Sequence, residues 1–183
     1  MVLTPCLLYQ SISRVNSTFL SGSNEFTCPV CKKGKLQYRD HCKRISRSEG
    51  GTSTWFWIPR CRCDNGGCRK ITRMLPDFMT PNKHYRTDVI SGVLEDIISP
   101  DDSDSEDYPT ERTMERWKAW LQANIALIEA LLRRYNSGHP IFRSEQLEES
   151  GSLLQKLKDN NQNWLEKVLR LVYSTGNRMN PVR

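Results

Sequence analysis

Seven cysteines give this chain its clearest capacity for chemistry. They stand at positions 6, 28, 31, 42, 61, 63 and 68. Cys28 and Cys31 are separated by two residues and followed by two lysines and a glycine, the form of a zinc knuckle, in which two thiolates lie on a tight turn. An odd number of cysteines in close pairs argues against a secreted disulfide framework and favours metal binding in a reducing cytoplasm.

The second half of the predicted metal site lies within residues 61–68. A second cysteine pair about 30 residues after the first, across a β-hairpin, would complete a tetrahedral four-thiolate site. Cys63 and Cys68, separated by Asp-Asn-Gly-Gly, are favoured over a pair that uses Cys61, although their spacing is wider than usual. His41 and Cys42 are less favoured substitutes because they fall in the middle of an expected strand, and buried free thiols are the alternative to any metal.

We therefore predict one structural Zn²⁺ ion. Four protein ligands leave no open position for water, so this metal is expected to hold the fold and not to catalyse. Its binding free energy would replace a core that a segment of this composition lacks, since only 37% of the chain is hydrophobic. The predicted ligands are Cys28, Cys31, Cys63 and Cys68.

Positive charge is concentrated around these cysteines. Residues 28–73 hold 12 Lys/Arg and 3 Asp/Glu, a net charge of +9, whereas the whole chain carries +6, so the remainder sums to −3. Such a basic block suggests contact with the phosphates of a nucleic acid, although it could also be a solvated surface. The expected phosphate contacts are Lys32, Lys33, Lys43, Arg44, Arg60, Arg62, Arg69 and Lys70.

Residues 110–121 form a second candidate for nucleic-acid contact. Apolar residues recur at spacings of three and four from Met114 to Tyr135, which predicts a helix with one buried face. The start of this helix presents threonines and arginines on its other face, as a recognition helix in a major groove does. The alternative is a bundle helix with a solvated polar face. The expected DNA contacts are Thr110, Arg112, Thr113 and Arg116.

The remaining pattern predicts an α+β fold, with a small N-terminal zinc-ribbon β unit followed by an all-α region that is helix-turn-helix-like or a small bundle. β-prone runs at 36–45 and 52–62 flank a turn signal and predict a hairpin. Helices are expected at 87–98, from 110 to 135 and at 152–175, with Thr87 and Ser152 as caps and Gly176 as a stop. The predicted units are a tail or loosely attached strand at 1–25, a zinc ribbon at 26–85, a helical segment at 86–136 with an acidic loop at 100–109, and a C-terminal helix within 137–183.

Several short motifs resemble an uncharacterised family of Firmicutes that is associated with mobile elements. They are CPVC at 28–31, PRCRC at 59–63, CRKI at 68–71, LPDF at 75–78, PNKHY at 81–85 and YPTERTMERW at 108–117. Members of that family carry an N-terminal zinc ribbon followed by a helix-turn-helix-like segment, and the ribbon is similar to the N-terminal zinc-binding piece of insertion-sequence transposases. The resemblance implies an accessory or DNA-recognition protein, with 108–117 in the recognition helix.

Together these features predict a cytoplasmic protein that binds double-stranded DNA and is not an enzyme. The acidic residues fall in a flexible run or on helix faces, and neither a nucleophile–base pair nor a phosphate-binding glycine loop is evident. No apolar run approaches the roughly 20 residues of a membrane span.

The main alternative is a protein-interaction adaptor that docks on a transposase or self-associates through helices 110–135 and 152–175. A ribbon that binds single-stranded nucleic acid is a third possibility.

Overall fold

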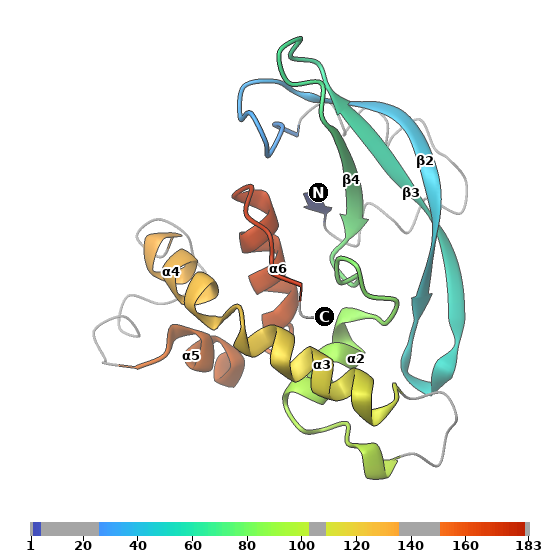
Figure 1. Cartoon of the computed structure of the whole chain (residues 1–183), viewed down its shortest axis with the longest axis vertical. Helices are drawn as coiled ribbons and strands as arrows, with labels where there is room; N and C mark the ends of the chain where they lie inside the picture. The colour runs from blue at the N-terminus through green and yellow to red at the C-terminus, as the bar shows by residue number, and fades with distance from the viewer. Residues whose placement is uncertain (1, 5–25, 103–108, 136–150, 182–183) are drawn as a thin grey trace.

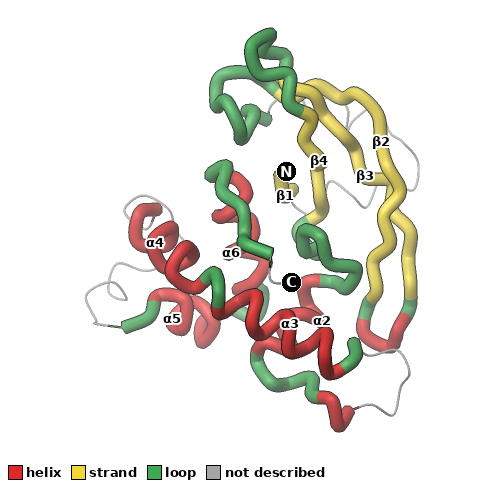
Figure 2. The backbone as a smooth tube through the Cα atoms, in the orientation of Figure 1, coloured by secondary structure: helices red, strands yellow, loops and turns green. Residues whose placement is uncertain are grey.

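The computed structural model describes residues 2–4, 26–102, 109–135 and 151–181. In these residues the chain has a mixed α+β fold, which confirms the predicted class, with a sheet along one side and helices along the other (Figures 1 and 2). The strands are β1 (Val2–Thr4), β2 (Leu36–Arg47), β3 (Ser53–Cys63) and β4 (Ile71–Pro76). The helices are α2 (Thr87–Leu94), α3 (Glu111–Gln122), α4 (Ile125–Tyr135), α5 (Leu153–Asn160) and α6 (Trp164–Ser174), with short 3-10 turns at Glu49–Gly51 and Pro100–Asp102.

The predicted hairpin is the dominant element of the sheet. β2 and β3 pair antiparallel over almost their whole length, from Leu36 opposite Cys63 to Arg47 opposite Ser53. Gly50, with φ +75°, makes the turn at the tip, where an L side chain would be strained. Strands alternate their side chains between two faces, and on one face of this hairpin Trp55 and Trp57 are 63% and 42% exposed.

The sheet has the order β1-β4-β3-β2. β4 pairs antiparallel with only the last part of β3, and β1 runs parallel to β4. β1 lies within the segment at 1–25 that was predicted to be a tail or a loosely attached strand, and the other residues of that segment lie outside the described part of the chain. The sheet therefore places β1, its first strand in the sequence, next to β4, its last.

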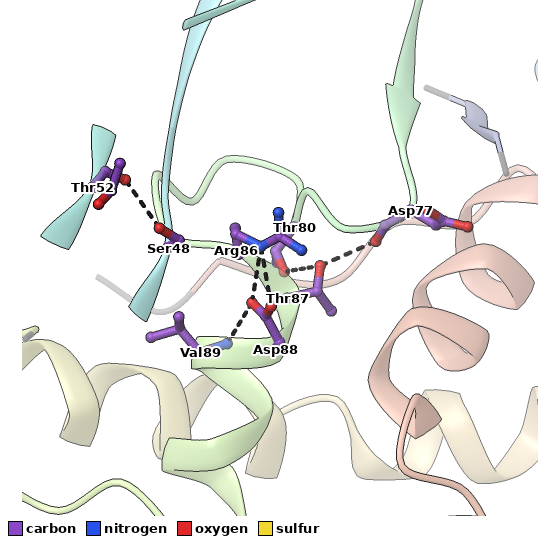
Figure 3. Close-up of polar contacts among 8 residues, drawn as sticks. All are labelled: Ser48, Thr52, Asp77, Thr80, Arg86, Thr87, Asp88 and Val89. Atoms are coloured by element: carbon purple, nitrogen blue, oxygen red, sulfur yellow. Dashed lines mark hydrogen bonds and ion pairs between the residues drawn. The ribbon is translucent and has the colours of Figure 1, made fainter. Parts of the chain in front are cut away.

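A hydrogen-bonded junction connects β4 to α2 (Figure 3). Thr87 was expected to cap α2, but it is instead the first helical residue, and Arg86 occupies the cap position. The buried Thr87 hydroxyl donates to the carbonyl oxygen of Asp77 at 3.1 Å and lies 3.2 Å from the Thr80 hydroxyl. No side chain caps the helix, but the Asp88 carboxylate in its first turn accepts the backbone N–H of Val89 and adds negative charge at the helix start.

Each of the two longer predicted helices is interrupted by an asparagine. The buried side-chain amide of Asn124 donates to the carbonyl oxygen of Trp120 at 2.7 Å and, with its oxygen, binds the backbone of Asn180, so the stretch from 110 to 135 divides into α3 and α4. Asn161 donates in the same way to Leu157, and α5 ends there. The acidic loop predicted at 100–109 falls mostly within residues 103–108, outside the described part of the chain.

One hydrophobic cluster joins the sheet to the helices. It includes Leu36 and Ile58 of the hairpin, Ile90 of α2 and Val168 of α6, all fully buried. Trp117, Trp120 and Trp164 are also at most 3% exposed, so they belong to this core. None of the helices in the described residues is long and apolar enough to cross a membrane.

Candidate metal centre

Four cysteine sulfurs converge at the end of the hairpin opposite its tip. The Sγ atoms of Cys28, Cys31, Cys63 and Cys68 all lie within 4.8 Å of one another. The Cys28–Cys68 and Cys31–Cys63 sulfur pairs are 3.9 and 3.6 Å apart. Metal–sulfur bonds of about 2.3 Å in a tetrahedron would place the sulfurs about 3.8 Å apart. The four predicted ligands are therefore brought together in a geometry that suits a tetrahedral metal ion.

The first two ligands lie on a tight backbone turn. The Lys32 N–H donates to the carbonyl oxygen of Cys28, and Lys32 itself has φ +56°. Gly34 then closes the turn, because its carbonyl oxygen accepts the Cys28 N–H at 2.8 Å and its own N–H donates to the Cys31 sulfur at 3.4 Å. A Cβ atom on Gly34 would lie 2.5 Å from the Cys63 sulfur, so glycine is required where the two loops meet.

The second loop repeats this turn with a different first residue. The Arg69 N–H donates to the carbonyl oxygen of Asn65, and Arg69 has φ +48°, as Lys32 does in the first loop. Asn65 thus takes the place that Cys28 holds in the first turn, three residues before Cys68. The third sulfur of the cluster comes instead from Cys63 at the end of β3. This substitution explains why Cys63 and Cys68 are farther apart in the sequence than Cys28 and Cys31.

The thiols differ in acidity. The backbone N–H groups of Gly34 and Lys33 lower the pKa of Cys31 to about 6, whereas burial raises the pKa of Cys63 to about 12. Cys31 is therefore the more readily ionised of the two thiols, and a metal that binds Cys63 would have to displace its proton into solvent.

The alternative ligands lie outside the sulfur cluster. Cys61 is buried on β3, where it pairs with Tyr38 and Thr72 in the sheet. Among the described residues, the group that could hold a metal ion contains Cys63 and not Cys61, and it contains neither Cys42 nor His41. The His41 ring packs edge-on against Trp57 and lies 2.8 Å from the Tyr38 hydroxyl.

Most of the cations that were predicted to contact phosphate are exposed, and five of them lie on or beside the two turns that hold the clustered cysteines. The exposed side chains are those of Lys32, Lys33, Arg62, Arg69 and Lys70. Lys43 lies farther along the hairpin, with its Nζ atom 4.9 Å from the centre of the Trp57 ring. These residues leave a cationic surface over both turns that hold the sulfurs.

Two predicted phosphate contacts have structural partners instead. Arg44 is half-buried and donates from Nη2 to the carbonyl oxygens of Thr80 and Lys83, each at 2.6 Å, and burial lowers its pKa. Arg60 binds the Asp40 carboxylate through two hydrogen bonds of 2.5 and 2.6 Å. From the sequence, both looked like surface cations because nothing in the local pattern marks the partner across the fold.

α3 divides as expected into a buried and an exposed face. Met114 and Trp117 are buried, while Arg112 and Arg116 are exposed. Thr110 is the N-cap residue, and its hydroxyl lies 3.0 Å from that of Thr113 without bonding to the backbone of the helix. α2 packs against α3, but 16 residues lie between them, a longer connection than the three or four residues of a helix-turn-helix.

One known protein family matches a stretch of the chain that includes both the clustered cysteines and the first part of α3. Residues 28–117 match a family described as a domain of unknown function, DUF6431. The match begins at the first cysteine of the quartet and ends in α3, so it contains all four clustered thiols and both exposed arginines of that helix. No curated protein and no solved structure matches the chain.

Proposed function

We propose that this chain is a zinc-stabilised, double-stranded DNA-binding protein, an accessory or recognition factor of a mobile element that acts in the cytoplasm by binding and not by catalysis. The observation that carries this proposal is the overlap of two features. The same two turns that hold the four sulfurs also present exposed lysines and arginines, at Lys32, Lys33, Arg69 and Lys70. A metal that fixes these turns would also fix a set of phosphate contacts.

Zinc is the metal that we assign to the four thiols. A tetrahedral set of four sulfurs suits zinc or an iron–sulfur centre, and the knuckle-like turns on which the cysteines lie favour a single zinc ion. All four positions would be occupied by protein, so the ion would be structural. This region then resembles a zinc ribbon, with β2 and β3 as its hairpin.

In this proposal the exposed side chains of α3 contact base edges, while the lysines and arginines of the ribbon contact phosphates. The exposed face of α3 offers Arg112 and Arg116, one helical turn apart, with Thr113 between them. Arginine recognises guanine through paired hydrogen bonds in the major groove, which suits an arginine at the start of a helix. The buried opposite face holds the helix in a fixed orientation.

The second candidate function is a protein-interaction adaptor for a transposase or for a second copy of the chain. The exposed indoles of Trp55 and Trp57 favour it, because large exposed aromatic residues often anchor interfaces. Trp117, Trp120 and Trp164 do not support it, since they are buried in the core. An adaptor would therefore bind through the hairpin more readily than through its helices.

The test is fluorescence anisotropy of the zinc-loaded chain with duplex and single-stranded DNA at two salt concentrations. Tighter binding to duplex that weakens steeply with salt is expected. Arg112→Ala is expected to reduce discrimination between preferred and random duplexes by about 1–3 kcal/mol, whereas Lys33→Ala should weaken both equally. If the wild-type chain binds no DNA at low salt, the proposal fails and the adaptor becomes the leading candidate.

A further inference from the structure

A surface cleft lies between the sheet, α3 and the last described residues of the chain. It has a volume of about 940 Å³ and is lined by residues of β3 and β4, the loop at 81–83, α3, and the end of α6 with the segment that follows it. This volume is at the upper end of the range for small-molecule sites and is large enough for more than one phosphate group. The sheet and three other parts of the chain therefore meet there.

Each of those parts contributes a positive charge. The four cations are Arg73 of β4, Lys83 of the loop, Arg116 of α3 and Arg178 near the C-terminus. None of the four forms an ion pair with a carboxylate among the described residues, and no aspartate or glutamate is among the residues that line the cleft. A fifth cation in the lining, Arg60, is already neutralised by Asp40.

The fold holds Lys83 and its loop in place. Lys83 is half-buried with its Nζ atom 4.9 Å from the centre of the Trp120 ring, and burial together with the charge of Arg116 lowers its pKa. Its loop is fixed by the guanidinium of Arg44, which donates to the carbonyl oxygens of Thr80 and Lys83, and by Asn82, whose φ is +61°. Like charges gathered without counter-charges are destabilising by themselves, and an anion would relieve the repulsion.

We propose that this cleft binds the phosphate groups of a DNA strand through Arg73, Lys83, Arg116 and Arg178. This inference rests on the proposed DNA-binding function and locates its main phosphate contact away from the tips of the metal loops. It also changes the role of one residue, because Arg116 then contacts phosphate, and base reading falls to Arg112. A strand that leaves the cleft along α3 reaches Arg112 one helical turn away.

The experiment compares two double variants that lose the same charge. Arg116→Gln/Arg178→Gln removes two cations from the cleft, and Arg133→Gln/Arg134→Gln removes two exposed cations from the last turn of α4, outside it. Binding of a labelled random duplex is measured by anisotropy as a function of salt, with circular dichroism to verify folding. At 0.1 M salt the cleft variant should bind about 50-fold more weakly, with a salt slope lower by about two, as expected for two lost phosphate contacts. The α4 variant should differ from wild type by less than about threefold, because it loses only long-range attraction.

The possible failures are distinguishable. If the wild-type chain binds DNA and the cleft variant binds equally well, the cleft assignment is wrong and the DNA-binding function stands. Equal losses in the two double variants would show that only net charge matters, which also overturns the cleft. Absence of DNA binding by the folded wild-type chain overturns both proposals. A single-stranded probe that loses more affinity than the duplex would support the cleft while assigning it to an unpaired strand.

Discussion

Gly34 lies against the Cys63 sulfur, so this position has no room for a side chain. A methyl group there would lie 2.5 Å from the sulfur and 2.7 Å from the Asp64 carboxylate oxygen. Gly34→Ala is therefore expected to push the two metal loops apart and to weaken zinc binding by about 10–100-fold, as loss of a supporting contact around a metal does. Competition with a chromogenic chelator measures the affinity.

Gly66 offers a matched control for this substitution. It lies in the second metal loop, but a Cβ atom there would have no neighbour within 4 Å. Gly66→Ala should retain the wild-type zinc affinity to within about threefold. Equal affinities for the Gly34→Ala and Gly66→Ala chains would contradict the close packing of Gly34 against Cys63.

Cys61 and Cys63 allow the ligand assignment to be tested directly. They are two residues apart on the same strand, but only Cys63 belongs to the sulfur cluster. Cys63→Ser should lower the zinc content of the purified chain well below one ion, because a hydroxyl is a poor replacement for a thiolate. Cys61→Ser should retain one ion, as measured by elemental analysis. The opposite result would move the third ligand to Cys61.

Glu129 of α4 connects two helices by capping the start of α5. Its carboxylate accepts the backbone N–H groups of Leu153 and Leu154 and the hydroxyl of Ser152. Burial alone would raise the pKa of Glu129, but these hydrogen bonds and the charge of Arg133 lower it below its ordinary value. The ionised side chain therefore stabilises the folded state above the pKa of the unfolded chain, and this contribution is lost as pH falls through the lower folded pKa.

Glu129→Gln is accordingly expected to reduce the free energy of unfolding at pH 7 by about 1–2 kcal/mol, as loss of a charged helix cap does. The difference from wild type should shrink in acid, which denaturant titration at pH 7 and at pH 4 can measure. Glu115→Gln, on the exposed face of α3, provides a control with the same charge change. A constant difference across this pH range would contradict the capping role of the carboxylate.

Local pattern predicted those elements whose evidence lies within a few residues. The hairpin follows from its β-prone runs and turn signal, the Ser152 hydroxyl accepts the Gln155 N–H as a cap, and Gly176, with φ +84°, follows the end of α6. The break at Asn124 was not predictable in this way, because its amide binds Asn180, which is remote in the sequence.

The same distinction applies to the candidate sites. Cysteine spacing predicted a quartet that the fold brings together, because tight turns place their ligands locally. The cationic cleft was not apparent from the sequence, since Lys83 and Arg178 lie almost 100 residues apart and outside the basic block. The structural roles of Arg44 and Arg60 likewise depend on partners in other strands and loops.

At the scale of the whole molecule, the β2–β3 hairpin and the cysteine turns beside it are attached to the helices at both ends of the hairpin. Near the hairpin tip, the N–H of Arg47 donates to the carbonyl oxygen of His84, and its own carbonyl oxygen accepts the N–H of Arg86. At the metal end, Gly176 after α6 lies against the carbonyl oxygen of Pro29, so closely that a side chain there would clash. Buried residues of the sheet and of the helices belong to the same hydrophobic cluster. The metal site and the helical region are therefore expected to unfold together.

Removal of the metal tests this coupling. In the zinc-loaded chain we expect one thermal transition, followed at 222 nm by circular dichroism. Chelation should shift that entire transition to lower temperature, because the binding free energy of a structural zinc contributes to the stability of everything that folds with it. Hydrogen exchange of the metal-free chain should show lost protection in α6 as well as in the two metal loops, since Gly176 and Pro29 join them. Unchanged protection and melting of the helices after complete metal removal would instead show that the hairpin and its cysteine turns fold as an independent unit, whose loss does not destabilise the helices.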